Sequence, residues 1–383
     1  MLSSPLPDAQ GRKLVFVVTE DWFFASHFLP MARAARELGL AVTVVTRVRS
    51  HRDIIEATGA KVIPLEAERR SLNPMAAGYT AGQLAAILKA EKADLVHCIA
   101  LKSILIGGFA AAMSGVSRRV YALTGSGFLG ARADTVSRLS QRAVRLLVRG
   151  LETPKTRYLF ENTDDPKLLG LDPASPRVTI LGGAGIDPVI LRPEPLPAQP
   201  PLKVAVVARM LWSKGIDVAV EAVRAARAKG GAIELSLYGA PDPSNPKAIP
   251  EDTLKAWSTE PGITWHGVTQ DIAAVWQNHH VACLPSRGGE GLPRTLLEAA
   301  ACGRAIVTTD VPGCRTLVRD GVEGRLVPSG NTASLAEALL TLSAQPDLVA
   351  RMGDAARARV LDGFTERDVM DNVKQLYGSM LAS

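Results

Sequence analysis

The sequence is poor in the features that mark several common classes of protein. It has only four cysteines, with no CxxC spacing, which argues against a disulfide framework or a zinc site. No run approaches the roughly 18 apolar residues that a membrane-spanning helix needs. Aromatic residues make up 5% of the chain and few lie between the arginines, so nucleic acid is not expected as a partner. Residues 1–7 lack the basic lead and apolar run of a secretory signal, so we expect a cytoplasmic protein.

Positive charge is concentrated in the first half of the chain. The 383 residues carry a formal charge of +6. Residues 1–195 hold 25 Lys and Arg against 18 Asp and Glu, whereas residues 196–383 hold 19 against 20. The basic half indicates contact with an anion, such as a phospholipid head group or a phosphorylated substrate, or else ordinary solubilising charge.

Short β-branched runs alternate with helix-length segments along the whole chain. These runs lack polar alternation, as do the strands of a parallel sheet that helices cover on both faces. The sequence therefore predicts an α/β fold with two doubly wound, Rossmann-like domains facing across a cleft. The predicted strands are residues 14–18, 41–45, 61–64, 94–98 and 119–123, then 203–207, 235–238, 263–265, 281–284 and 305–307.

A proline-rich segment separates the two series of strands. Five prolines between positions 193 and 201 exclude a helix or a central strand there. We predict an N-terminal acceptor-side domain over residues 1–190, a linker over 191–202 and a C-terminal donor domain over 203–365. Residues 366–383 form a last helix that can pack back toward the N-terminal domain. Ligands are expected beyond the carboxyl ends of the strands.

The segment from 284 to 303 is the most informative for function. A buried strand ends at Pro285, a glycine-rich loop follows, and Pro293 stands where a helix should begin. Free amides at such a helix start, approached closely because glycines precede them, can bind a diphosphate. Glu290 lies just before the helix and Glu298 inside it, where they suit the hydroxyls of a sugar and of a ribose. The alternative is a tight turn with two exposed glutamates.

A second strand end supplies positive charge. After residues 203–207 come Arg209 and Lys214. Their guanidinium fork and ammonium group could hold the same phosphates, although either cation alone would more often be a solvated surface charge.

Together these motifs resemble the donor domain of glycosyltransferases with the GT-B fold, specifically the retaining family 4 group. The first half is similar to the branch of that family that builds O-antigen, capsule and exopolysaccharide repeat units. The donor-domain resemblance rests on Arg209…Lys214-Gly215, the Glu-x7-Glu spacing of Glu290 and Glu298, and residues 183–187, 302–304, 309–315 and 321–328. In the first half it rests on residues 20–24, 26–27, 71–74, 94–97 and 100–102.

The resemblance implies a role for each charged residue. Glu290 would hold hydroxyls of the donor sugar, and Glu298 would hold the ribose. Arg209 and Lys214 would balance the charge that develops on the departing diphosphate.

It also implies roles for three further positions. Amides near Gly291 and Leu292 would bind the donor. His97, at a strand end of the first domain, would touch the transferred sugar across the cleft, or would serve only as a structural hydrogen bonder.

The chain departs from the family pattern in one loop. The loop before Glu290 carries Arg287-Gly288-Gly289 where relatives often have two residues.

The function that the resemblance implies is a retaining, metal-independent glycosyltransferase. It would move a sugar from a nucleotide-sugar, preferably a UDP-sugar, to a polyprenyl-diphosphate-linked or growing glycan acceptor. Front-face attack requires no enzymic nucleophile, and the chain has no Asp-x-Asp metal motif, so no cofactor is expected. Two alternatives stay open: a sugar-nucleotide epimerase of the same fold, and a non-catalytic partner that binds a nucleotide-sugar.

Residues 135–149 predict a basic amphipathic helix. Arginines at 138, 142, 145 and 149 fall on one helical face beside apolar residues. Such a helix could rest on anionic lipid at the inner face of the cell membrane and admit a lipid-linked acceptor. It could equally be a surface helix whose arginines are solvated.

Overall fold

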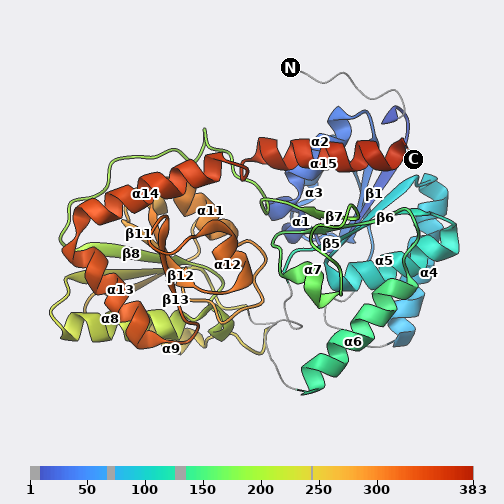
Figure 1. The fold of residues 1–383 in the computed structure, drawn as a ribbon. Coiled ribbons are helices and arrows are strands. Elements are labelled where there is room, and N and C mark those ends of the chain that lie inside the picture. The colour runs from blue at the N-terminus through green and yellow to red at the C-terminus, as the bar shows by residue number, and fades with distance from the viewer. Residues whose placement is uncertain (1–8, 67–73, 126–134, 243–244, 383) are drawn as a thin grey trace. The chain divides into compact units, whose positions relative to one another are not determined.

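The computed structural model describes residues 9–66, 74–125, 135–242 and 245–382 (Figure 1). The chain divides into two compact units. Unit 1 contains the chain up to Gly185 together with the segment from Glu366 onward, and unit 2 runs from Ile186 to Thr365. Residues 71–73, part of the family-like pattern of the first half, lie outside the described residues.

Unit 1 is built on a parallel sheet with the strand order β3-β2-β1-β4-β5-β6-β7 in its described part. Its strands are β1 (Lys13–Glu20), β2 (Ala41–Arg47), β3 (Lys61–Pro64), β4 (Leu95–Ile99), β5 (Arg118–Leu123), β6 (Thr156–Phe160) and β7 (Val178–Ile180). Its helices are α1 (Asp21–His27), α2 (Leu29–Glu37), α3 (Arg52–Glu56), α4 (Pro74–Glu91), α5 (Ala100–Ser114), α6 (Thr135–Gly150), α7 (Asp165–Leu168) and α15 (Glu366–Leu381).

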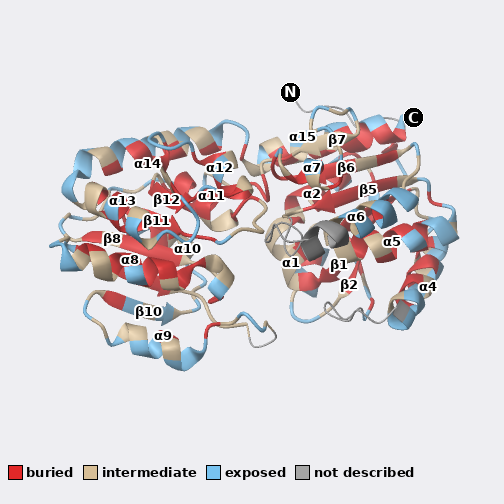
Figure 2. Cartoon of the chain, turned by 60° about the horizontal axis from the view of Figure 1, so that its bottom comes forward, coloured by how far each residue is buried: buried red, intermediate tan, exposed pale blue. Residues whose placement is uncertain are grey.

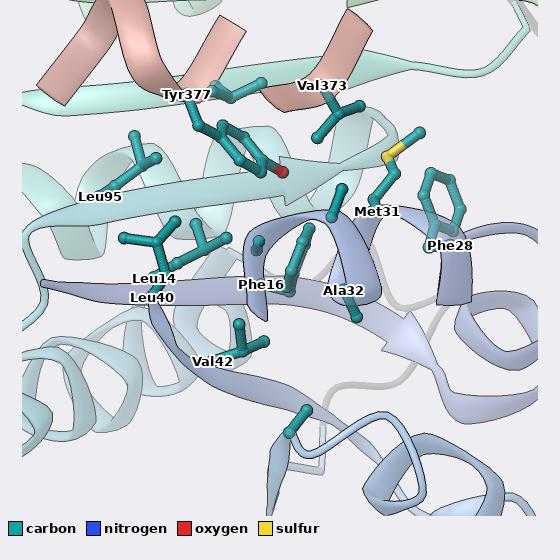
Figure 3. Close-up of a cluster of buried hydrophobic side chains, with 14 of the residues drawn as sticks. Leu14, Phe16, Phe28, Met31, Ala32, Leu40, Val42, Leu95, Val373 and Tyr377 are labelled. Atoms are coloured by element: carbon teal, nitrogen blue, oxygen red, sulfur yellow. The ribbon is translucent and has the colours of Figure 1, made fainter. Parts of the chain in front are cut away.

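The last helix, α15, completes the core of unit 1. Val373 and Tyr377 are fully buried against the face of the sheet that carries Phe16, and α2 contributes Met31 to the same cluster. Figure 3 shows these side chains turned toward one another from α15, α2 and β1. Burial of each such side chain contributes about 1.5–3 kcal/mol, so the C-terminal helix is an integral part of this unit.

Unit 2 repeats the architecture with the strand order β10-β9-β8-β11-β12-β13, all parallel. Its strands are β8 (Leu202–Val207), β9 (Ile233–Tyr238), β10 (Ile263–Gly267), β11 (Val281–Leu284), β12 (Ala305–Thr309) and β13 (Gly324–Val327). Its helices are the 3-10 turn η2 (Trp212–Lys214), α8 (Ile216–Ala228), α9 (Glu251–Ser258), α10 (Ile272–Gln277), α11 (Arg294–Ala301), α12 (Pro312–Leu317), α13 (Thr332–Ala344) and α14 (Pro346–Leu361).

The predicted α/β fold with two Rossmann-like sheets is confirmed. The strands that the apolar runs predicted are present in both sheets, and Figure 2 shows most of them as buried. β6, β7 and β13 were not predicted as strands. β7 has only three residues, and β13 begins with Gly324-Arg325, so neither forms the apolar run that marks a central strand.

The proline-rich segment differs from the predicted linker because it belongs to unit 2 and is fastened along it. Arg304 donates to the carbonyl of Glu194 at 2.7 Å, Arg357 to that of Leu191 at 2.9 Å, and Gln199 to that of Leu342 at 3.0 Å. Prolines leave carbonyls without strand partners, and long side chains supply the donors instead.

Candidate functional site

Two neighbouring strands of unit 2 bring the predicted donor loops together. β8 and β11 are paired in parallel, with Val204 opposite Val281 and Ala205 opposite Ala282. Because parallel strands end at the same edge of a sheet, the loop after β8 and the glycine-rich loop after β11 emerge side by side. The former carries Arg209 and Lys214, and the latter carries Glu290.

Lys214 and Glu290 form a close ion pair at this edge. The Lys214 Nζ lies 2.7 Å from each carboxylate oxygen of Glu290, and the side chains are 20% and 12% exposed. The hydroxyl of Ser286, itself fully buried, donates to Glu290 Oε1 at 2.7 Å. The carboxylate is thus fixed in orientation by a cation and a hydroxyl, and part of it still faces solvent. The alternative of two exposed glutamates is wrong.

The loops approach so closely that two glycines are required. Gly215, between η2 and α8, has φ 72°, and a Cβ there would lie 1.9 Å from the carbonyl oxygen of Pro285. A Cβ on Gly313, in α12, would lie 1.3 Å from the carbonyl oxygen of Gly291. Any side chain at either position would push the loop of Glu290 away from its neighbours.

Ser286 is a site residue that sequence reasoning missed. Its carbonyl oxygen accepts hydrogen bonds from the hydroxyls of Thr309, at 2.6 Å, and Ser329, at 3.2 Å. These bonds hold the first residue of the glycine-rich loop against β12 and the turn after β13. The position of Ser286, four residues before Glu290, is the only signal in the sequence that could have identified it.

Arg209 lies on the same loop as Lys214 but has a different partner. Its Nη1 is 3.2 Å from Asp242, beyond the end of β9, and its side chain is 43% exposed. The structure therefore brings Lys214 and Glu290 together directly, while Arg209 is held toward β9.

The second glutamate lies within α11. Glu298 is 8% exposed and accepts a hydrogen bond from Arg294 Nε at 2.9 Å. Burial raises the pKa of Glu298 above its usual value, and the positive charge of Arg294 opposes that rise. The helix starts at Arg294, with Pro293 as its N-cap and no capping side chain. The Leu292 side chain is 3% exposed in the core, so this residue can offer a ligand only its backbone.

The structure corrects the expectation for His97. This residue lies in the middle of β4, not at its end, and has no exposed surface. Its ring packs on Phe16, and its Nδ1 is 2.7 Å from the hydroxyl of Tyr377 on α15. Burial lowers the pKa of His97 to about 3, so the imidazole is neutral. His97 is a core residue with no surface to offer a sugar in this structure, because it is fully buried against Phe16 of β1 and Tyr377 of α15.

The basic helix α6 is partly engaged with unit 1. Arg145 donates to the carbonyl of Leu168 at 3.2 Å, and Val148 is buried. Arg142, Leu146 and Leu147 are exposed. The side chain of Arg138 lies outside the described residues.

Nowhere in the described parts of the chain do three His, Cys, Asp or Glu side chains gather as a metal site would need. No helix in those parts is long and apolar enough to cross a membrane.

Two parallel, Rossmann-like sheets in one chain define an α/β class of protein. Comparison with solved structures places the fold in the same class. The chain superposes with a TM-score of 0.75 on the Anabaena protein Alr3699/HepE in complex with UDP-glucose, at 16% identity, over 96% of this chain and 99% of that one. A sucrose-phosphate synthase from Thermosynechococcus elongatus gives 0.76 at 18% identity, over 97% and 99% of the two chains. The fold is that of the GT-B glycosyltransferases.

Sequence comparison gives the family. Residues 13–153 match the model "Glycosyl transferase 4-like", and residues 201–345 match "Glycosyl transferases group 1". A Campylobacter jejuni N,N'-diacetylbacillosaminyl-diphospho-undecaprenol alpha-1,3-N-acetylgalactosaminyltransferase is 24% identical over 93% of this chain and 96% of its own length. An amylovoran biosynthesis glycosyltransferase from Erwinia amylovora is 32% identical over 43% of this chain and 42% of its own length. The chain is a glycosyltransferase and belongs with family 4 of the GT-B enzymes.

Proposed function

We propose that this enzyme transfers a sugar from a UDP-sugar to a lipid-linked or growing surface-polysaccharide acceptor, with retention of anomeric configuration and without a metal ion. The observation that carries the donor half of this proposal is the contact between Lys214 and Glu290 at the paired ends of β8 and β11. This contact brings together, at one edge of the sheet, a cation for the diphosphate and a carboxylate that can accept from sugar hydroxyls.

The state of Glu290 favours orientation over nucleophilic attack. Its carboxylate already accepts from Lys214 and Ser286, so both oxygens are engaged and the group is fixed in place. In the proposed step, the acceptor oxygen bonds to the anomeric carbon on the face from which the diphosphate leaves. The bond from that carbon to the diphosphate oxygen breaks, and the acceptor proton passes to the departing phosphate. Glu290 holds the sugar during this exchange and forms no bond to it.

Lys214 and Arg209 supply the positive charge that such a departure needs. As the bond to the leaving group breaks, negative charge grows on the diphosphate, and fixed cations lower the energy of that state. Arg209 would have to exchange its exposed contact with Asp242 for phosphate, at small cost because surface ion pairs contribute about 0–1 kcal/mol. This pair of cations is our reason for proposing catalysis without a metal.

The acceptor is proposed from the relatives. The Campylobacter protein is named for a diphospho-undecaprenol substrate, and it matches along almost its whole length. The Anabaena structures contain UDP or UDP-glucose. These names support a UDP-sugar donor and an acceptor carried on a polyprenyl diphosphate.

The direct test supplies purified enzyme with a panel of UDP- and GDP-sugars and a polyprenyl-diphosphate-linked sugar. We expect UDP release that depends on the acceptor, is unchanged by EDTA, and gives a product with the anomeric configuration of the donor. An inverted product or loss of activity in EDTA would contradict those parts of the proposal. Epimerised donor formed without acceptor would contradict the proposed transfer to a lipid-linked or glycan acceptor.

We further propose that α6 rests on anionic lipid at the inner face of the cell membrane. Arg142 and the strongly exposed Leu146, one helical turn apart, give α6 an outward face that is both basic and apolar. Sedimentation with vesicles of phosphatidylglycerol should pull down the wild type, and neutral vesicles should not. Arg142→Glu combined with Leu146→Glu should abolish the effect; equal binding by this variant would refute a role for α6.

A further inference from the structure

Arg287, the first residue after Ser286 in the glycine-rich loop, reaches back across the turn that carries Lys214. Its guanidinium makes a two-pronged contact with Asp217 in the first turn of α8, at 2.7 and 2.6 Å. The same group also donates to the carbonyl of Trp212. Its backbone N–H donates to the carbonyl of Ser213 at 2.9 Å. One residue thus holds the chain on both sides of Lys214.

The loop beyond Arg287 has little of its own to fix it. Gly288 and Gly289 have φ values of 115° and 76°, a region that glycine enters without strain. A Cβ on Gly288 would meet no atom within 4 Å. Two permissive residues therefore separate Arg287 from Glu290, and the geometry of the loop depends on its anchors at either end.

We propose that the Arg287–Asp217 pair is a positioning clamp that sets the Lys214 ammonium against the Glu290 carboxylate for the transfer step. This inference rests on the proposed function of that site. The side-chain hydrogen bonds of Arg287 go to Trp212 and Asp217 rather than to Lys214 or Glu290, so it acts by fixing the η2 turn. Its planar fork presents separate nitrogens to the two carboxylate oxygens and a further N–H to a carbonyl, a geometry that the single nitrogen of a lysine does not reproduce.

The chain contains a matched control for the clamp. Arg224, also on α8, makes the same kind of two-pronged contact with Glu260, with Nε 2.7 Å from Oε2, and its side chain is 36% exposed against 39% for Arg287. Glu260 lies between α9 and β10, away from the ends of β8 and β11. Arg224→Ala should therefore reproduce the loss of a surface ion pair with no effect on the site.

The experiment compares Arg287→Ala, Arg287→Lys, Asp217→Asn and Arg224→Ala with the wild type. We expect Arg287→Ala to lower kcat about tenfold or more, with donor KM and UDP affinity little changed, because a small displacement of a charge affects the transition state most. Arg287→Lys should fall between Arg287→Ala and the wild type. In the double variant, Asp217→Asn should add little to the effect of Arg287→Ala, since both substitutions break the contact between these two side chains. Melting temperatures should match that of Arg224→Ala.

Amide hydrogen exchange gives a readout that does not depend on turnover. Arg287→Ala should speed exchange of the Gly215 and residue-287 amides, which donate to Trp212 and Ser213, whereas Arg224→Ala should not. Turnover of the wild type with donor and acceptor tests the proposed function independently of the clamp. Unchanged exchange in Arg287→Ala would overturn the clamp, as would a kcat equal to that of Arg224→Ala or a loss confined to melting temperature.

Discussion

At the scale of single residues, the site depends on how Glu290 is held. A carboxylate beside a diphosphate is unfavourable unless cations and donors surround it. Lys214 and Ser286 provide both at 2.7 Å. The strand ends predicted that Arg209 and Lys214 both face the glycine-rich loop, but not that Lys214 contacts Glu290 directly while Arg209 contacts Asp242.

Ser286→Ala tests the hydroxyl of this arrangement. Loss of a hydrogen bond to a charged group costs about 1.5–3 kcal/mol, so we expect kcat to fall at least about tenfold while UDP affinity is retained. Ser343→Ala is the matched control, because that partly buried hydroxyl in α13 donates to the Leu340 carbonyl and not to the loop of Glu290. Initial rates at saturating donor measure the difference. Equal rates for the two variants would remove Ser286 from the site.

His97 shows why a residue-level reading of sequence can fail. A histidine following Asp-Leu-Val looks like a strand-end residue, yet β4 continues through Ile99 and the ring is completely buried against Phe16 and Tyr377. Its partner Tyr377 comes from 280 residues further along the chain. No local pattern contains that contact, and only the docking of α15 decides the burial of His97.

At the scale of elements, close backbone contacts fix the loops. Gly313→Ala would place a Cβ 1.3 Å from the Gly291 carbonyl oxygen, so α12 and the loop must separate. We expect about 1–3 kcal/mol of destabilisation, as for other overpacked sites, with a loss of turnover larger than stability explains. Gly82→Ala in α4, where a Cβ meets nothing within 4 Å, is the control and should leave turnover unchanged and stability equal or up to about 1 kcal/mol higher. Chemical denaturation measures the loss of stability, and initial rates measure the loss of turnover. A fully active Gly313→Ala enzyme would contradict the requirement for close contact between α12 and the loop of Glu290.

The contact between β4 and α15 predicts acid sensitivity. Burial lowers the pKa of His97 to about 3 from 6.5, so the folded state resists its protonation. The contribution of the neutral, buried His97 to the free energy of unfolding is complete above pH 6.5. That contribution is lost as the pH falls toward 3, by about 1.4 kcal/mol per pH unit.

His97→Asn keeps a hydrogen-bond acceptor for Tyr377 but cannot take up a proton in this range. Urea unfolding at pH 7 and pH 5 should show a smaller drop in the free energy of unfolding for this variant than for the wild type. Because the other histidines are common to both proteins, the difference isolates His97. The same pH dependence in both proteins would show that His97 protonates freely in the fold.

At the scale of the whole molecule, the chain completes unit 1 only at its C-terminus. Alternating apolar runs predicted both sheets, because a parallel strand buried on two faces leaves a clear sequence signal. The partners of Arg287 and Arg304 were not predictable, since nothing local links an arginine to an aspartate or a carbonyl that lies 70 or 110 residues away.

The division into units makes a prediction about truncation. Residues 1–185 alone would expose the face that Val373 and Tyr377 cover, and we expect that fragment to aggregate. Joining Gly185 to Glu366 through a short linker should give a soluble, cooperatively folded unit 1. The two ends lie close, because Ile186 N donates to the Phe364 carbonyl at 3.1 Å. Thermal unfolding of both proteins tests this; a folded 1–185 fragment would contradict the role given to α15.

The most direct test of the central claim is the rate of UDP release by Glu290→Ala with donor and acceptor at saturation. If Lys214 and Glu290 together hold the donor for transfer, the rate falls by about two orders of magnitude or more while the melting temperature stays near that of the wild type. A variant that turns over at close to the wild-type rate would show that the edge formed by β8 and β11 does not carry the reaction.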